Sequence, residues 1–318
     1  MKLGGGSVID SSQDLDFHGT ALSPNSVPAL YRSMRATYRH PLGGLPGVSR
    51  FIRWQIATRL LGSARVQVPW IGGTQLILER GMQGATGNYY CGLLEYADMS
   101  FLLDVLRPDD LFVDVGANVG VYTVLASGVC GARTVALEPV DKAFSRTERH
   151  IEANGLQELV EAHKLAAGDA RGTATMTVDS DTTNRLATGS EATFAPGSTA
   201  TVEIDTLDNV LDGREATLIK IDVEGWELPA LRGAVETLAA SSMLALILEV
   251  NGASRSYGIS EQELQAFVLD NDFHPYAYVP DSRQLIPGRS SPGGNVIFIR
   301  DKVAVDERLV AAPERGLR

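Results

Sequence analysis

Apolar and polar positions alternate in two different periods along residues 111 to 300, in a regular order. Short apolar runs with the spacing of strands are followed by amphipathic stretches with the spacing of helices. The predicted strands are 111–116, 133–138, 160–167, 217–222, 243–250, 273–279 and 294–300, and the predicted helices are 119–129, 141–154, 229–241 and 260–271. Strand, helix and strand in series predict an α/β fold: a doubly wound, mostly parallel, seven-stranded sheet.

Two regions depart from this alternation. Residues 172–205 contain Thr-rich β stretches on both sides of a polar loop, which predicts an inserted β-hairpin. Before the main pattern, residues 47–62 predict a helix, 65–79 a hairpin around Gly72 and Gly73, and 97–106 a short helix. We therefore divide the chain into four regions: a disordered tail (1–28), a basic extension of helix plus hairpin (29–84), a main domain (85–305) and a C-terminal tail (306–318).

Charge separates the N-terminal extension from the rest of the chain. The 318 residues carry a net charge of −11, yet residues 31–80 hold eight arginines, no lysine and one acid, which is +7 and leaves −18 for the remainder. An acidic body argues against a nucleic-acid partner, because neutralising phosphates needs a broad basic surface. The basic arm admits an acidic ligand or a membrane surface. The simpler expectation is that it docks on the acidic body or on a second copy in a homodimer.

Cysteine content and the N-terminal sequence bear on the compartment. Two cysteines, Cys91 and Cys130, form no C-x-x-C or Cys/His cluster and cannot make a disulfide framework. The first residues contain no apolar signal-like run. We expect a cytoplasmic protein.

The turn within residues 111–120, LFVDVGANVG, holds the first candidate site. Asp114 ends an apolar strand, and Gly116, Asn118 and Gly120 follow before a helical pattern. Glycines here let the backbone turn tightly and approach a ligand at the next helix's N-terminus. A dinucleotide fingerprint needs three glycines as G-x-G-x-x-G, which the turn lacks. An NAD-linked oxidoreductase is therefore disfavoured.

Acids also end the next two predicted strands. Glu138 ends the second strand, and Asp169 follows the third. Ligands of open α/β sheets bind outside the carboxyl ends of the strands. Glu138 could accept hydrogen bonds from both hydroxyls of a ribose, and Asp169 would lie near an adenine amino group. Asp114, Glu138 and Asp169 together predict a nucleoside site.

The stretch LIKIDVEGWELPALRGA, residues 218–234, holds the second constellation. If 218–224 is extended, Lys220, Asp222 and Glu224 share one face of a central strand. A buried charge without a partner costs several kcal/mol, so Lys220 is expected to pair with a carboxylate, either structurally or as part of the catalytic group. Glu227 is expected to open the following helix.

Further polar and aromatic residues complete the candidates. Asp222, Glu249 and Asn251 could form an oxygen-rich Mg²⁺ site, although we predict no metal. His274 is a candidate base because of its ordinary pKa range. Asn295 is expected in the cleft or a turn. Aromatic residues that could stack on an acceptor ring, or equally lie in the core, are Tyr89, Tyr90 and Trp226.

The D-x-G-x-x-x-G turn resembles the first motif of Rossmann-like methyltransferases. With Glu138-Pro139, AAGDARG (166–172), TVEIDTLDNVL (201–211), KIDVEGWELPALRGA and GNVIFIR, the chain resembles the FkbM family of S-adenosylmethionine-dependent methyltransferases over residues 85–300. The resemblance implies a Rossmann-like methyltransferase fold, S-adenosylmethionine as cofactor, and O-methyl transfer to a sugar, glycolipid or natural-product hydroxyl.

Roles for the candidates follow from this resemblance. Asp114, Gly116, Asn118 and Gly120 would hold the methionine end, Glu138 the ribose and Asp169 the adenine. Asp222 would lie near the cofactor's methyl group, and Glu224 is the first choice for the base or acceptor anchor, with Lys220 and His274 as further catalytic candidates. Two alternatives stay open: a Mg²⁺-dependent O-methyltransferase of a vicinal diol, and a non-catalytic nucleoside-binding protein with this fold.

Overall fold

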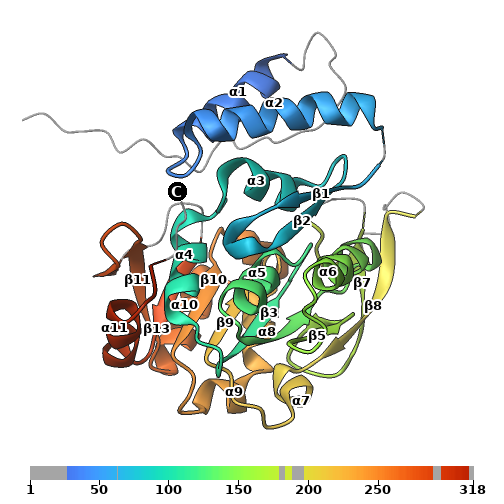
Figure 1. The fold of residues 1–318 in the computed structure, drawn as a ribbon. Coiled ribbons are helices and arrows are strands. Elements are labelled where there is room, and N and C mark those ends of the chain that lie inside the picture. The colour runs from blue at the N-terminus through green and yellow to red at the C-terminus, as the bar shows by residue number, and fades with distance from the viewer. Residues whose placement is uncertain (1–26, 63, 179–182, 188–196, 289–294, 315–318) are drawn as a thin grey trace, which may run out of the picture.

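The computed structural model describes residues 27–314 apart from 63, 179–182, 188–196 and 289–294, with side chains from Tyr31 onward. The tail predicted for residues 1–28 lies almost wholly outside the described residues. An eight-stranded sheet occupies the centre of the molecule (Figure 1), in the order β12-β11-β13-β10-β9-β3-β4-β5. These strands are β3 (Leu111–Val115), β4 (Arg133–Leu137), β5 (Val160–His163), β9 (Leu218–Ile221), β10 (Ala245–Glu249), β11 (His274–Val279), β12 (Gln284–Pro287) and β13 (Asn295–Ile299).

Strand directions confirm the mostly parallel sheet. Strands β5, β4, β3, β9 and β10 pair in parallel, β13 is antiparallel to β10, and β11 is antiparallel to β13. The sheet has one strand more than predicted, because β12 adds to β11 at the edge. The strand predicted at 160–167 is two strands in different sheets: it breaks after His163, and β6 (Ala166–Ala167) pairs with β8 (Thr199–Asp205) instead.

Apolar side chains cover both faces of the sheet, as expected for parallel strands. On β3, Val113 and Val115 face one core cluster, and Phe112 faces the other. Helices α7 (Leu207–Leu211), α8 (Glu227–Arg232), α9 (Val235–Ala239) and α10 (Glu261–Asp270) bury residues in the first cluster. The second contains residues of α4 (Tyr96–Val105), the segment α5 (Val121–Val124) with its π-helical continuation Leu125–Val129, and α11 (Lys302–Val310).

The inserted hairpin is confirmed. Strand β7 (Gly172–Thr177) pairs antiparallel with β8, and β6 completes a three-stranded sheet beside the main one. Met176, Val202 and Leu186 of the insertion pack with Val140 and Ala143 at the start of α6 (Asp141–Ala153). The insertion thus forms a side wall next to the carboxyl ends of β4 and β5.

The N-terminal extension consists of two helices above a hairpin (Figure 1). Helix α1 (Val27–Arg39), which was not predicted, packs on α2 (Gly44–Leu60). Strands β1 (Val66–Pro69) and β2 (Gln75–Leu78) pair antiparallel and form the predicted hairpin. Phe51 and Trp54 of α2 are buried against β2 and helix α3 (Gln83–Cys91). The helix therefore covers an apolar core, and the arm attaches to the body mainly through apolar contacts.

The C-terminal tail predicted for residues 306–318 is wrong over its first part. Helix α11 buries Val305 and Leu309 in the second core cluster, and Arg308 forms an ion pair with Asp110 at 2.5 Å. The sequence analysis missed this helix because only two of its apolar residues, four positions apart, are buried. The main domain thus continues through α11.

Truncating one of these buried residues tests this boundary. Leu309→Ala should lower the free energy of unfolding by about 2–5 kcal/mol, because it removes a side chain that is 1 % exposed and leaves a cavity. The matched control is Val310→Ala on the same helix, where the side chain is 86 % exposed and the expected change is within about 0.5 kcal/mol. Equal denaturation midpoints for the two variants would show that α11 does not belong to the folded core.

Candidate active site

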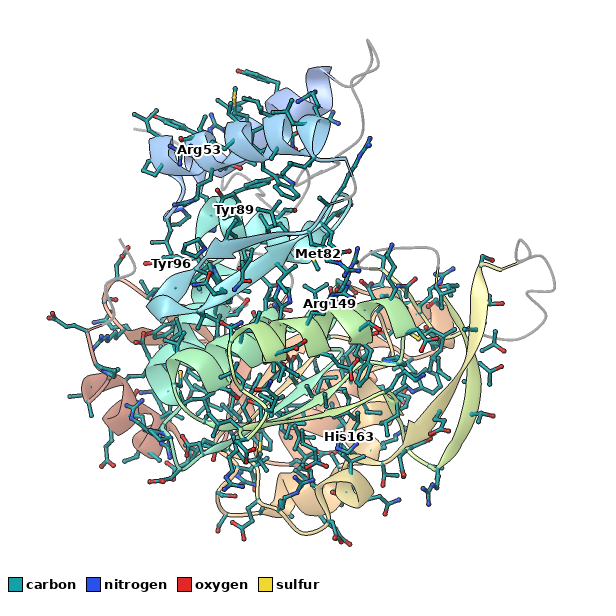
Figure 2. The ribbon with its side chains drawn as sticks, turned by 45° about the vertical axis from the view of Figure 1, so that its right-hand side comes forward. Arg53, Met82, Tyr89, Tyr96, Arg149 and His163 are labelled. Atoms are coloured by element: carbon teal, nitrogen blue, oxygen red, sulfur yellow. The ribbon has the colours of Figure 1, made fainter. Side chains whose placement is uncertain are left out.

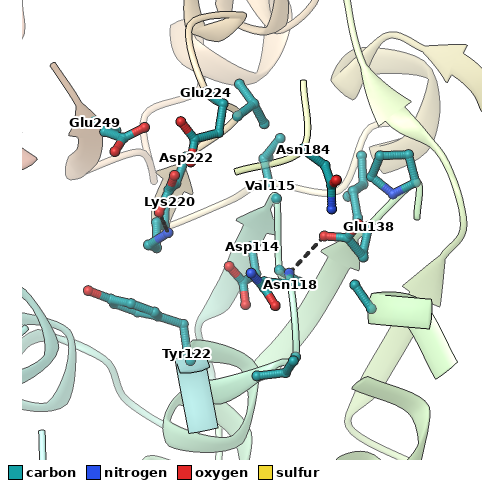
Figure 3. Close-up of a pocket in the computed structure, with 18 of the residues that line it drawn as sticks. Asp114, Val115, Asn118, Tyr122, Glu138, Asn184, Lys220, Asp222, Glu224 and Glu249 are labelled. Atoms are coloured by element: carbon teal, nitrogen blue, oxygen red, sulfur yellow. Dashed lines mark hydrogen bonds and ion pairs between the residues drawn. The ribbon is translucent and has the colours of Figure 1, made fainter. Parts of the chain in front are cut away.

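A pocket of about 280 Å³ opens at the carboxyl ends of β3, β4, β9 and β10. Its lining combines these strand ends with α3 and with the insertion. Figure 3 shows the residues at the strand ends together with Asn184 of the insertion. This is the place where open α/β sheets bind their ligands. The predicted residues that line it are Asp114, Gly116, Asn118, Glu138, Lys220, Asp222, Glu224, Trp226 and Glu249.

Asp114 and Gly116 shape the turn after β3. Asp114 is 1 % exposed, and its Oδ2 accepts hydrogen bonds from the Thr123 backbone N–H (3.1 Å) and hydroxyl (2.7 Å). Its Oδ1 is buried with no hydrogen-bond partner. Burial raises the pKa of Asp114, although Lys220 and the Thr123 bonds oppose the rise. At Gly116 a Cβ atom would lie 2.0 Å from the Asp222 carbonyl oxygen, so only glycine fits.

Two backbone N–H groups hold the Glu138 carboxylate. Its carboxylate accepts hydrogen bonds from the N–H groups of Asn118 (2.8 Å) and Val140 (2.9 Å), and Figure 3 shows the first as a dashed line. Burial raises the pKa of Glu138 to about 7, against the effect of these two bonds. A carboxylate offers about four acceptor sites, so two remain for hydroxyl donors of a ligand.

Two cofactor predictions are not supported by position. Gly120 is absent from the pocket lining of the described residues: a Cβ there would lie 2.9 Å from Thr147 Cγ2, so this glycine permits close packing against α6. Asp169 is exposed and lies beyond β6, because the chain leaves the main sheet after His163. Asp169 does not line the pocket among the described residues, so its position does not support the predicted adenine role.

Apolar residues line the side of the pocket that β6 and the insertion form. Leu165, Ala167, Met176 and Leu186 line the pocket on this side, together with Trp226. Sequence reasoning identified the hairpin but not its inward face. The alternation in GTATMTVD, with Met176 on one face, was the available signal.

Lys220 pairs with a carboxylate as predicted. Its Nζ lies 2.8 Å from Asp222 Oδ2 and 4.8 Å from the centroid of the Tyr122 ring. Burial lowers the pKa of Lys220, but the charges of Asp222, Glu95 and Asp114 outweigh burial and raise it above its ordinary value. The lysine therefore stays charged and holds Asp222 as an anion.

Glu224 and Glu249 complete a group of three carboxylates with Asp222, whose ligand oxygens lie within 4.8 Å of one another. Strand β9 ends at Ile221, so the condition that 218–224 is extended is not met, and Glu224 lies in a turn with φ of 54°. Burial and the charges of Asp222 and Glu227 raise the pKa of Glu224 to about 7. Burial and the neighbouring Asp222 and Glu224 raise the pKa of Glu249 to about 10.

These three acids thus have three different states near neutral pH. Asp222 is ionised beside Lys220, Glu249 is protonated, and Glu224 titrates near pH 7. Figure 3 shows them grouped on one side of the pocket, opposite Glu138. A carboxyl group that titrates near the operating pH suits general acid or base catalysis.

Glu227 opens α8 as predicted, but it also supports the site. Its Oε1 accepts hydrogen bonds from the N–H groups of Gly225 (2.9 Å) and Val223 (3.3 Å). These bonds fix the turn that carries Glu224. Gly225 has φ of 101°, and a Cβ there would lie 2.6 Å from the Ala253 backbone, so the turn requires glycine.

Sequence reasoning missed Glu95 and Tyr122. Both line the pocket, and the Tyr122 hydroxyl donates to Glu95 Oε2 at 2.6 Å. Asn295, predicted for the cleft or a turn, is buried at the start of β13 and donates to Glu95 Oε1 and Asp98 Oδ2, each at 3.1 Å. No motif marks Glu95, because a helix that precedes the main pattern brings it to the pocket.

Four other predicted residues lie off the pocket. His274 is exposed at the start of β11 and pairs with Ile299, so it lies at the edge of the sheet away from the pocket. This position does not support its predicted catalytic role. Asn251 is exposed and accepts from the Ala253 N–H, so it does not join Asp222 and Glu249. Tyr90 is buried in the core below α2, and Tyr89 packs on that core.

The fold and this site define a Rossmann-like α/β protein with a ligand pocket at its strand ends. The model of the methyltransferase FkbM domain matches residues 114–274, about half of the chain. The chain belongs to this family. No curated protein matches it.

Similar solved structures include a methyltransferase FkbM from Methylobacillus flagellatus KT, with 19% identity, a TM-score of 0.42, and coverage of 67% of this chain and 52% of that one. The chain thus spans about half of that protein. An rRNA methylase from Streptococcus thermophilus has 13% identity and a TM-score of 0.37, with coverage of 64% of this chain and 93% of that one. SMU.1697c, a putative methyltransferase from Streptococcus mutans in complex with SAH, has 13% identity and a TM-score of 0.38, with coverage of 64% of this chain and 96% of that one.

Proposed function

We propose that this protein is an S-adenosylmethionine-dependent O-methyltransferase that acts on a hydroxyl of a sugar, glycolipid or natural-product scaffold. One observation carries the proposal. Glu224, with a pKa raised to about 7, lies in the same pocket as Gly116 and Glu138, the residues suited to the cofactor. Membership of the methyltransferase FkbM family supports it.

The residues of the pocket fit this cofactor. The buried Oδ1 of Asp114 has no hydrogen-bond partner, so it could accept from the ammonium of a methionine end. Glu138 retains acceptor sites for two ribose hydroxyls, and the wall of Met176, Leu186 and Trp226 suits a flat adenine ring. When bound, S-adenosylmethionine supplies an electrophilic methyl group on a sulfonium. Acidic residues also suit that positive charge.

The chain's own residues would position and deprotonate the acceptor. Glu224 would accept the proton that the acceptor hydroxyl loses when its oxygen takes the methyl group. Such proton transfer contributes typically 10²- to 10⁴-fold. Lys220 keeps Asp222 ionised, so Asp222 can accept a hydrogen bond from the acceptor and orient its oxygen.

The cluster of three carboxylates also supports a second candidate function, that of a Mg²⁺-dependent O-methyltransferase of a vicinal diol. Asp222, Glu224 and Glu249 offer oxygens within 4.8 Å of one another, in place of the predicted set with Asn251. Mg²⁺ takes oxygen ligands in near-octahedral geometry. Here the ion would compete with the Lys220 ammonium for Asp222. Activity that is abolished by EDTA and restored by Mg²⁺ would favour this candidate over the metal-free one.

Calorimetric titration of the purified protein separates the classes of function. We expect binding of S-adenosylmethionine and S-adenosylhomocysteine and none of NAD, because the turn lacks the three-glycine fingerprint. Incubation of cell extracts with methyl-labelled cofactor, followed by mass spectrometry, should then show label on a hydroxyl oxygen. Cofactor binding with no labelled product in any extract would favour the non-catalytic alternative. NAD binding would contradict both the O-methyltransferase proposal and that alternative.

A further inference from the structure

Helix α2 carries two opposite apolar faces. Gly47, Phe51 and Trp54 face the body and are buried. On the other side lies a ridge of four apolar residues spaced by seven, four and four positions, which places them in one line along the helix. This outer ridge is Leu45 (74 % exposed), Ile52 (46 %), Ile56 (51 %) and Leu60 (79 %).

Arginines flank the outer ridge. Arg53 and Arg59 are exposed and lie on opposite sides of the line through Ile52 and Ile56. Figure 2 places Arg53 on the pair of helices farthest from the sheet, with Tyr89 of α3 beneath. Helix α1 presents a similar mixture, with exposed Tyr31 (58 %), Tyr38 (56 %) and Arg35.

We infer that α1 and α2 form a docking surface for an anionic membrane. Helices that lie in a bilayer interface typically carry apolar residues flanked by arginines, with tyrosines beside them. Residues 31–78 contain no acid, so the surface is complementary to anionic headgroups. The inference goes beyond the proposed function, because it concerns where the protein binds rather than what it methylates.

Charge argues against a second copy as the occupant. A symmetric dimer through the outer ridge would bring the arginines of both copies together, with no carboxylate from α1 or α2 of either copy to pair them. A lipid surface has no such conflict. The arrangement also places the pocket close to the membrane, because Gly84 and Asn88 of α3, the helix on which α2 packs, line it.

Flotation of the full-length protein with vesicles tests the inference. We expect binding at low salt to vesicles of phosphatidylcholine and phosphatidylglycerol mixed seven to three, and little binding to phosphatidylcholine alone or at high salt. Ile52→Ser/Ile56→Ser should weaken binding at least tenfold, since each buried CH₂ contributes about 0.8 kcal/mol. Arg53→Gln/Arg59→Gln should weaken it about 25-fold, at roughly 1 kcal/mol per arginine.

Matched controls use exposed apolar residues and exposed arginines on other elements of the chain. Val303→Ser/Val310→Ser on α11 removes apolar side chains that are 69 % and 86 % exposed, and Arg133→Gln/Arg171→Gln removes two exposed arginines. Both should bind as the unmodified protein does. The inference is overturned if the protein does not bind anionic vesicles, or if the α2 variants bind them as tightly as the control variants do. Sedimentation velocity showing a dimer that Ile52→Ser/Ile56→Ser converts to monomer would assign the ridge to a second copy instead.

Discussion

Glu224→Gln should abolish methyl transfer while leaving affinity for S-adenosylmethionine within about threefold of the unmodified protein. Glutamine keeps the size of the side chain but cannot accept the acceptor's proton, so the full contribution of a general base, about 10²- to 10⁴-fold in kcat, is lost. Cofactor affinity should persist because Glu138 and Asp114, on the other side of the pocket, are untouched. Single-turnover rates and calorimetry measure the two quantities separately.

The pH profile provides a second check on Glu224. The pKa of Glu224 is raised to about 7, so the carboxyl is protonated below that pH and ionised above it. As a base it must be ionised, and kcat/KM should therefore rise tenfold per pH unit below about pH 7 and level off above it. Exposed Glu215→Gln serves as the control and should change neither rate nor profile. Turnover retained by Glu224→Gln would remove this residue from the mechanism.

Glu138→Ala should weaken binding of S-adenosylmethionine by at least about 100-fold. The change removes the acceptor for two ribose hydroxyls and leaves the N–H groups of Asn118 and Val140 without their partner. Hydrogen bonds to charged groups contribute about 1.5–3 kcal/mol each, which sets this magnitude. Calorimetry gives the affinity, and Glu138→Gln, which retains one acceptor oxygen, should fall between Ala and the unmodified protein.

The raised pKa of Glu138 predicts the direction in which stability changes with pH. Its folded-state pKa of about 7 exceeds the unfolded value of about 4.3, so its contribution to stability is present at low pH and is lost as pH rises through 7. Glu138→Ala should therefore reduce the fall in Tm between pH 5.5 and pH 8. Cofactor affinity should rise over the same interval, because hydroxyl donors favour the ionised carboxylate. Unchanged affinity in Glu138→Ala would contradict the ribose assignment.

Several elements could be predicted from local sequence because their causes are local. Glycine at 116 was predicted in the turn after a strand, and the structure shows there a positive φ that disfavours other residues. The helix predicted at 260–271 is α10, and the Ser260 hydroxyl at its start accepts the Glu263 N–H at 3.1 Å. The pairing of Lys220 with a carboxylate was predicted from the cost of an unpaired buried charge, and the structure identifies the partner as Asp222.

Other features depended on contacts between distant segments. Asp169 was misplaced because β6 pairs with β8, on the far side of the inserted hairpin loop, rather than extending β5. His274 was misplaced because the direction of β11, set by pairing with β13, puts its first residue at the edge away from the pocket. Neither pairing has a signal within the segment itself.

The sequence alone determined the fold class, the turn at Gly116, and the line of acids at successive strand ends, because alternation, backbone sterics and the cost of burying charge act over short stretches of chain. Only the tertiary structure decided which acids share a pocket and how each titrates. Glu224 and Glu249 differ in pKa through burial and through each other's charge. Both effects depend on distances between strand ends that are far apart in the chain, which no local pattern encodes.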